Sequence, residues 1–135
     1  MAEQTGSAPD LGIDLGSDLG IDLDLDRFTR RGYPEAVYCE GKTADQVAEI
    51  ARRIRESTAG ASGVTLFTPA AAEHAAAVLQ ELPDAFHDPA ARLLAWPPEP
   101  PVPVGGLVVV ACAGTSDLPV AREAALTASY LGRRV

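Results

Sequence analysis

The residues best suited to chemistry lie in the turn Gly114-Thr115-Ser116-Asp117. Glycine allows the backbone to turn sharply. Two hydroxyl groups then stand beside backbone amides that point outward from the start of a predicted helix. These donors, together with the helix dipole, favour binding of a phosphate or a carboxylate. The simpler interpretation, in which Ser116 or Asp117 only caps the helix, also fits the spacing.

A second candidate is Lys42, in the triplet Gly41-Lys42-Thr43. The triplet follows a predicted strand and opens a predicted helix, as the end of a P-loop does. The P-loop pattern needs another glycine five residues before Gly41, where this chain has Ala36. We therefore reject a nucleotide triphosphatase and expect a turn followed by a helix cap. Lys42 could still bind an anion there.

Arg27, Arg30 and Arg31 form a third candidate, with three cations within five residues. Such a cluster could clamp a phosphate, or it could be the exposed face of a short helix. The only histidines, His74 and His87, have no Cys or carboxylate at ligand spacing. The sequence therefore predicts no metal site.

The composition separates an acidic leader from a nearly neutral remainder. Residues 1–26 hold seven of the 19 acids and none of the 11 bases, which leaves 12 acids against 11 bases in the rest. We expect residues 1–25 to be a disordered acidic leader. Nothing basic indicates nucleic-acid binding. No signal peptide and no membrane-spanning apolar run is visible.

Two cysteines are too few for a disulfide framework in a chain of 135 residues, which favours a reducing, cytoplasmic location. Cys39 and Cys112 both fall in predicted strands. A thiol inside an apolar strand is usually inert.

The elements that must position these residues alternate between strand and helix patterns, which is typical of an α/β fold. A small β-α-β-α-β-β domain is predicted over residues 26–96. Its elements are a strand at Glu35–Glu40, a helix capped by Thr43 and Gln46, a strand at Val64–Phe67, a helix begun by Thr68-Pro69, and a hairpin of Phe86-His87 with Arg92–Trp96.

A stiff linker is predicted at residues 97–106, where five of the chain's 11 prolines stand in the first seven positions. The apolar run Leu107–Ala113 then predicts a strand that enters the Gly114 turn and a helix from Asp117 and Pro119. A parallel strand needs neighbours and helices on both faces. We therefore expect residues 107–135 to be the first βα unit of an incomplete parallel-sheet domain.

Two motifs carry a resemblance to a known family. Residues 27–43 read Arg-x-x-Arg-x-Gly-Tyr-Pro-Glu-Ala-Val-Tyr-Cys-Glu-Gly-Lys-Thr, followed by Gln46-Val-Ala-Glu-Ile. Residues 113–121 read Ala-Gly-Thr-Ser-Asp-Leu-Pro-Val-Ala, followed by Glu123-Ala-Ala-Leu-Thr-Ala. Together they resemble LarB, the nickel-pincer-nucleotide cofactor biosynthesis family, over residues 26–135. The acidic leader lies outside the resemblance.

The resemblance implies that the second domain is similar to PurE, the phosphoribosylaminoimidazole carboxylase (mutase). In that family the turn reads Gly-Ser-x-Ser-Asp and holds the phosphate and ribose of a nucleotide. Ser116 and Asp117 match its last two positions, whereas Gly114 replaces the earlier serine and Thr115 takes the variable position. We expect phosphate contact to be rearranged, with Thr115 as a substitute donor.

The resemblance also implies a reaction. LarB-type proteins carboxylate the pyridinium ring of nicotinic acid adenine dinucleotide and hydrolyse its phosphoanhydride, which yields a pyridinium dicarboxylate mononucleotide and AMP. Carbon dioxide or bicarbonate is the expected co-substrate, Mg²⁺ a candidate ion, and no tightly bound cofactor is expected. The family's nucleophile is a cysteine of a later segment, and neither Cys39 nor Cys112 matches it.

The site residues expected from this resemblance fall into two groups. Asp117 is the catalytic candidate, because it could orient a ribose hydroxyl or transfer a proton. The substrate-binding candidates share positions in the two motifs: Gly114, Thr115, Ser116, Arg27, Arg30, Tyr33, Glu35 and Lys42. Homo-oligomerisation through a PurE-like core is also expected. Without the remainder of that core we expect this chain to be inactive on its own.

Two alternatives stay open. The chain could be a relative of the purine-pathway carboxylase that acts on an aminoimidazole ribonucleotide, although the domain ahead of Gly114 argues against this. It could also be a non-enzymatic nucleotide-binding module, in which residues 27–96 are the working part.

Overall fold

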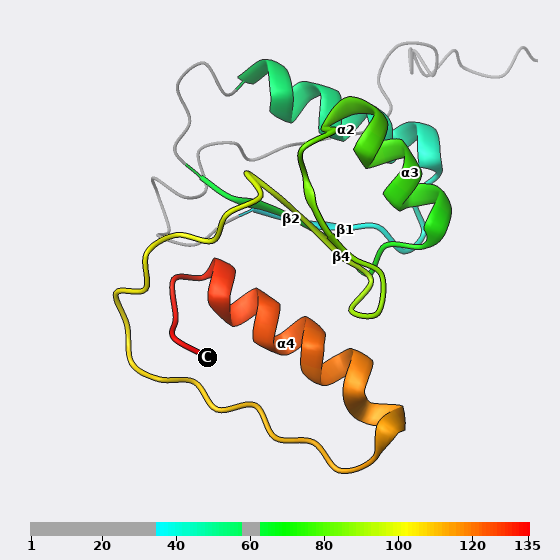
Figure 1. The fold of residues 1–135 in the computed structure, drawn as a ribbon. Helices are drawn as coiled ribbons and strands as arrows, with labels where there is room; N and C mark the ends of the chain where they lie inside the picture. Colours follow the sequence, from blue (N-terminus) through cyan, green and yellow to red (C-terminus); the bar gives the residue numbers. More distant parts are fainter. Residues whose placement is uncertain (1–34, 58–62) are drawn as a thin grey trace, which may run out of the picture.

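The computed structural model describes residues 35–57 and 63–135, and it confirms the predicted βαβαββ order. Figure 1 shows the sheet with helices on both sides of it. The elements in chain order are β1 (Glu35–Tyr38), α2 (Ala44–Ser57), β2 (Thr65–Thr68), α3 (Ala72–Glu81), β3 (Phe86–Asp88), β4 (Leu93–Trp96), the 3₁₀ turn η1 (Thr115–Asp117) and α4 (Leu118–Tyr130). The predicted hairpin is β3 and β4, which pair antiparallel.

The four strands form one mixed sheet in the order β1-β2-β4-β3. β1 and β2 are parallel, with Tyr38 opposite Thr68, because α2 crosses over between them. β4 runs antiparallel to β2, with Phe67 opposite Leu94. The carboxyl ends of β1, β2 and β3 and the start of β4 therefore meet at one end of the sheet.

One face of the sheet packs against α2 and α3. Successive strand residues point to opposite faces, so Val37, Phe67 and Leu94 point together toward the helices. The apolar stripes of α2 and α3 complete this core with Val47, Ile50, Ala51, Ile54, Ala75, Val78 and Leu82, all buried. Cys39 is buried in the same cluster. The helical periodicities predicted from the sequence are therefore confirmed.

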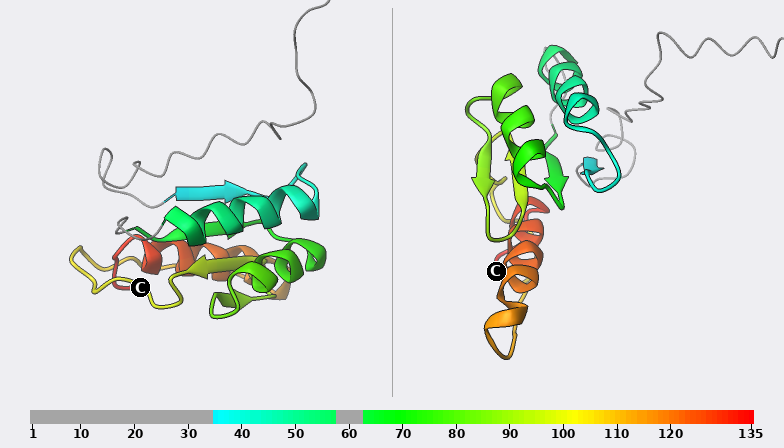
Figure 2. Two further views of the ribbon diagram at one scale, coloured as in Figure 1. Left: turned by 90° about the horizontal axis from the view of Figure 1, so that it is seen from above. Right: turned by 90° about the vertical axis from the view of Figure 1, so that its right-hand side faces the viewer.

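The opposite face packs against the C-terminal half of α4, which Figures 1 and 2 show on the side away from α2 and α3. Leu66, Leu93 and Ala95 alternate with the residues of the first core and contact Tyr130 in a second cluster. The Tyr130 ring lies 6.0 Å from that of Phe86, and its hydroxyl donates to the Pro98 carbonyl at 2.6 Å. The second face is thus covered over β2, β3 and β4, whereas Ala36 and Tyr38 of β1 stay exposed on it.

The start of α2 agrees with prediction. The Thr43 amide donates to the Gln46 side chain at 2.9 Å, and the Gln46 amide donates to Thr43 Oγ1 at 3.2 Å, which is a reciprocal capping box.

The predicted start of α3 at Thr68-Pro69 is wrong. Thr68 is still paired in β2, and the Ala70 amide is bonded to the Arg92 carbonyl, so the chain stays extended until Ala71. His74 caps the helix instead, since its Nδ1 accepts from the Ala71 amide at 3.2 Å. Nε2 then carries the proton and donates to the Lys42 carbonyl at 2.9 Å.

The predicted strand at Leu107–Ala113 does not join the sheet. Its single contact of strand type is a parallel bridge between Leu107 and Arg134. In Figure 1 this segment lies on the far side of α4, so the helix separates it from the strands of the sheet. Leu107 and Val109 are 62% and 79% exposed, and Cys112, which was predicted to lie inside an apolar strand, is exposed and outside any strand.

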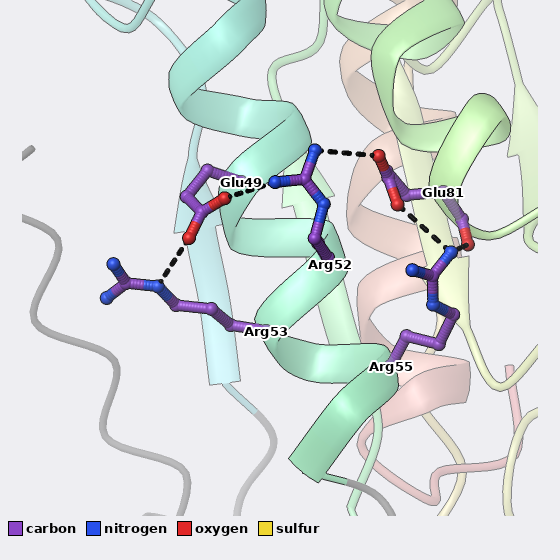
Figure 3. Close-up of polar contacts among 5 residues, drawn as sticks. All are labelled: Glu49, Arg52, Arg53, Arg55 and Glu81. Carbon is purple, nitrogen blue, oxygen red and sulfur yellow. Dashed lines mark hydrogen bonds and ion pairs between the residues drawn. The ribbon is translucent and has the colours of Figure 1, made fainter.

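A carboxylate-guanidinium network joins α2 to α3 on their outer side (Figure 3). Glu81 of α3 accepts from Arg52 at 3.0 Å and pairs with Arg55 at 3.0 Å, and both arginines belong to α2. Glu49 pairs with Arg52 and Arg53 within α2. The Arg52 hydrogen bond is the main cause that lowers the pKa of Glu81 below its usual value.

We predict that Glu81→Gln destabilises the protein near neutral pH but not in acid. A carboxyl group with a lowered folded-state pKa stabilises the fold above its unfolded pKa and loses this effect as the pH falls through the folded value. Urea unfolding of wild type and variant at pH 7 and at pH 3 measures the difference. Glu99→Gln, an exposed carboxylate outside both helices, is the control. An equal difference at both pH values would contradict the prediction.

His74→Ala should cost about 1–3 kcal/mol of unfolding free energy, because it leaves the partly buried Ala71 amide and Lys42 carbonyl without these hydrogen bonds. Gln80→Ala, an exposed position of the same helix, is the control. Chemical denaturation followed by circular dichroism gives both values. Equal midpoints for the two variants would show that His74 neither caps α3 nor ties it to the loop before α2.

Candidate functional site at the polar end of the sheet

Polar side chains gather where β1, β2 and β3 end and β4 begins. We call this set the polar end; its members are Tyr38, Glu40, Lys42, Thr68, Asp88, Arg92, Arg122 and Glu123. Three strands, two loops and α4 contribute to it, so residues up to 85 positions apart in the sequence meet there. In open α/β sheets, ligands bind outside the carboxyl ends of the parallel strands. The polar end is therefore the candidate functional site.

Lys42 is held at this end by the turn that follows β1. Gly41 adopts a φ of 83°, which glycine tolerates without a side-chain clash, and the Lys42 amide bonds to the Cys39 carbonyl at 3.0 Å. The ammonium group donates to the Tyr38 carbonyl at 2.8 Å. Lys42 is also the only lysine of the chain. The triplet is a turn and a cap, as expected, with a cation kept beside the end of β1.

Tyr38 stands next to this cation and is 58% exposed. Its hydroxyl donates to the Glu40 carboxylate. That hydrogen bond is the main cause that raises the pKa of Tyr38, whereas the positive charge of Arg92 acts in the opposite direction. An exposed aromatic ring with cations of Lys42 and Arg92 in its surroundings can pack against a flat ring of a ligand while the cations contact its anionic groups.

Two polar contacts tie α4 to the polar end. Thr68 Oγ1 donates to Glu123 at 2.6 Å. Arg122 pairs with Asp88, and its Nε donates to the same carboxylate oxygen at 3.2 Å. The other oxygen of Asp88 accepts from the Ala91 amide at 2.9 Å. The Arg122 guanidinium, followed by the backbone amides, holds the pKa of Asp88 below its usual range.

The turn Gly114-Thr115-Ser116-Asp117 lies on the same side of the molecule but farther out. Gly114 has a φ of 93°, and no side chain caps η1 or α4, so the interpretation of Asp117 as a helix cap is not supported. All four residues are exposed. Because Asp117 precedes Glu123 by six residues, it lies about 9 Å farther along the α4 axis from the sheet contact. Its hydroxyls and carboxylate face solvent.

The sequence-predicted site residues therefore divide into four groups. Lys42 lies at the polar end, and Gly114 to Asp117 lie beyond it along α4. Glu35 begins β1 and lies at the opposite end of that strand from Tyr38. Arg27, Arg30 and Tyr33 lie outside the described residues. The structure thus does not bring Glu35 and Lys42 together.

Sequence reasoning missed seven members of the polar end: Tyr38, Thr68, Glu40, Asp88, Arg92, Arg122 and Glu123. The first two could have been found from their place at the ends of two predicted strands joined by one helix, since such parallel strands end at the same sheet edge. Nothing in the spacing indicates Arg92 or Glu123. The position of Arg92 follows from the antiparallel return of β4, and that of Glu123 from the docking of α4 on the second face.

The two cysteines differ strongly in environment. Burial raises the pKa of the Cys39 thiol to about 11, and its Sγ lies 3.6 Å from the Val37 carbonyl. Cys39 is therefore unsuited to act as a nucleophile. Cys112 is exposed and lies in the extended segment before the turn.

A separate cleft of about 340 Å³ lies between α3 and the β3–β4 turn. Its lining is apolar except for His87, and consists otherwise of Ala70, Ala71, Ala72, Ala75, Ala76, Leu79 and Pro89. Within residues 35–57 and 63–135, no three His, Cys, Asp or Glu side chains are grouped to hold a metal ion. In the same part of the chain, no helix is long and apolar enough to cross a membrane.

Comparison with known proteins gives a family. The search of curated proteins finds no match. A scan against protein families matches residues 17–98, more than half of the chain, to the LarB/PurE-like N-terminal domain. The match includes the whole four-stranded sheet with α2 and α3, and the members of the polar end up to Arg92. This chain belongs to the LarB/PurE-like N-terminal domain family.

Proposed function

We propose that this chain serves a LarB-type pyridinium carboxylase and hydrolase that converts nicotinic acid adenine dinucleotide to a pyridinium dicarboxylate mononucleotide. The observation that carries the proposal is the order of two features. A LarB/PurE-like N-terminal domain is followed by a Gly-Thr-Ser-Asp turn at the start of a helix, as the resemblance to LarB requires.

The polar end supplies groups that fit such a substrate. A dinucleotide carries a phosphoanhydride with two negative charges and a carboxylated pyridinium ring. Lys42 and Arg92 are cations suited to the phosphates, and the exposed Tyr38 ring is suited to a flat heterocycle. The turn adds the hydroxyls of Thr115 and Ser116 for phosphate or carboxylate oxygens.

Asp117 has the role of orienting a ribose hydroxyl or moving a proton. Its carboxylate is exposed and makes no cap bond, so it is available to a ligand. The burial and raised pKa of Cys39 agree with the expectation that Cys39 is not the nucleophile. No step is assigned to Mg²⁺, because the described residues include no group of three His, Cys, Asp or Glu side chains that could hold a metal ion.

The test is titration calorimetry of the 135-residue chain with nicotinic acid adenine dinucleotide and, separately, with aminoimidazole ribonucleotide. We expect the dinucleotide to bind, and Lys42→Ala and Arg92→Ala each to weaken binding about tenfold, the loss of one charge-assisted contact. Arg53→Ala, an arginine of α2 away from the polar end, is the charge-matched control and should bind as wild type.

A second measurement uses the single lysine. Acylation of Lys42, followed by mass spectrometry of the peptide that contains it, should slow when the dinucleotide is bound. Preferential binding of aminoimidazole ribonucleotide would favour the purine-pathway alternative. Binding of neither nucleotide, with the fold intact by circular dichroism, would contradict the proposed function.

A further inference from the structure

Arg92 has a backbone conformation that its side chain disfavours. Its φ is 53°, and it is the one residue other than glycine with a positive φ among residues 35–57 and 63–135. Backbone in this left-handed region favours glycine, and to a lesser extent asparagine and aspartate. A different residue held there stores local strain, and strain of this kind gathers at active sites and ligand-binding sites.

Hydrogen bonds on both sides hold Arg92 in this conformation. Its amide donates to the Pro89 carbonyl at 3.3 Å, which closes the turn between β3 and β4. Its carbonyl accepts from the Ala70 amide at 2.7 Å, just beyond the end of β2. Asp88, at the start of the turn, is buried and accepts from the Ala91 amide at 2.9 Å. None of these contacts needs the arginine side chain, so a glycine would fit the same turn without strain.

The guanidinium of Arg92 has no acidic partner among the described residues. In residues 35–57 and 63–98 the lysines and arginines are Lys42, Arg52, Arg53, Arg55 and Arg92. The three arginines of α2 pair with Glu49 or Glu81. Lys42 donates to the Tyr38 carbonyl, and Arg92 makes no ion pair or side-chain hydrogen bond with the described residues. The two cations of this domain that have no carboxylate partner therefore both lie at the polar end.

The sheet register places these two cations on the strands that flank β2. Tyr38 ends β1 opposite Thr68 of β2, and Arg92 precedes β4 and bonds to Ala70. Neighbouring strands lie about 4.8 Å apart, so the backbones of β1 and β4 are about 10 Å apart here. The hydrogen bond to Glu40 raises the pKa of Tyr38, but the positive charge of Arg92 opposes it, so the guanidinium lies within electrostatic range of that ring. Two linked phosphates can contact both cations more readily than a single phosphate can.

We propose that Arg92 is the residue by which the polar end selects a diphosphate group over a single phosphate, with Lys42 as the second contact. The strained backbone is then the consequence of an arginine at a position where the turn favours glycine. Loss of stability in exchange for function is common at such positions. The inference rests on the proposed function for the identity of the substrate, since the dinucleotide has a phosphoanhydride and aminoimidazole ribonucleotide has a single phosphate.

The binding test titrates inorganic pyrophosphate and inorganic phosphate into the 135-residue chain by calorimetry. We expect wild type to bind pyrophosphate about tenfold more tightly than phosphate, and Arg92→Ala and Arg92→Gly to lose most of this preference, the effect of one charge-assisted contact. Arg53→Ala removes the same charge from α2 and should keep the wild-type ratio. A wild type without preference, or an unchanged ratio in both Arg92 variants, would overturn the inference.

A second measurement separates the side chain of Arg92 from its backbone. Arg92→Gly should raise the urea midpoint above that of wild type, because glycine adopts the left-handed conformation without strain, whereas Arg92→Ala should leave the midpoint nearly unchanged. Ala90→Gly, at an exposed position of the same turn without a positive φ, should lower it. A lower midpoint for Arg92→Gly would refute the claim that the turn keeps a strained residue for binding.

The inference and the proposed function fail in different experiments. Pyrophosphate selection that depends on Arg92, without binding of nicotinic acid adenine dinucleotide, would contradict the proposed function but not the role of Arg92. Equal affinity of wild type and Arg92→Gly for the dinucleotide would contradict the role of Arg92 and leave the dinucleotide as the substrate.

Discussion

The structure depends on the need to cover both faces of a four-stranded sheet. Strand residues alternate between the faces, so Phe67 and Leu94 require α2 and α3, while Leu66 and Leu93 require something on the other side. α4 meets that requirement, and Tyr130 is the residue through which it does so. The contact of its ring with Phe86 contributes about 0.5–1.5 kcal/mol beyond the area that it buries.

This docking also gives the candidate site its composition. Because α4 lies on the second face, Glu123 contacts Thr68 and Arg122 contacts Asp88. The helix thus adds one acidic and one basic side chain to the residues at the strand ends. The acids are thereby neutralised or hydrogen-bonded within the protein. Lys42 and Arg92 stay beside the exposed ring of Tyr38, and this end of the sheet can therefore receive an anionic partner.

Much of the small domain could be predicted from local patterns. The capping box of Thr43 and Gln46, the apolar stripe of α2 and the hairpin at Asp88 each have a cause within a few residues, and the structure has all of them. The start of α3 could not be predicted, because Thr68 is kept extended by a strand 30 residues earlier and His74 replaces it as the cap. The apolar run at Leu107–Ala113 has a strong strand pattern, but a pattern contains no information on whether a neighbour is within reach. Among the site residues, Lys42 followed from its motif, whereas Arg92 and Glu123 depend on tertiary packing.

The uneven anchoring of α4 has a consequence for motion. Its last residue, Tyr130, is buried, and the contacts of Arg122 and Glu123 fix its middle, but Leu118 and Val120 are 49% and 68% exposed and no side chain caps the first turn. Local opening follows the density of buried contacts. The first turn should therefore exchange its amide hydrogens before the rest of the helix. The Gly114–Asp117 loop would thus sample several orientations while the middle and the end of α4 stay in place. A bound anion would select one of these orientations.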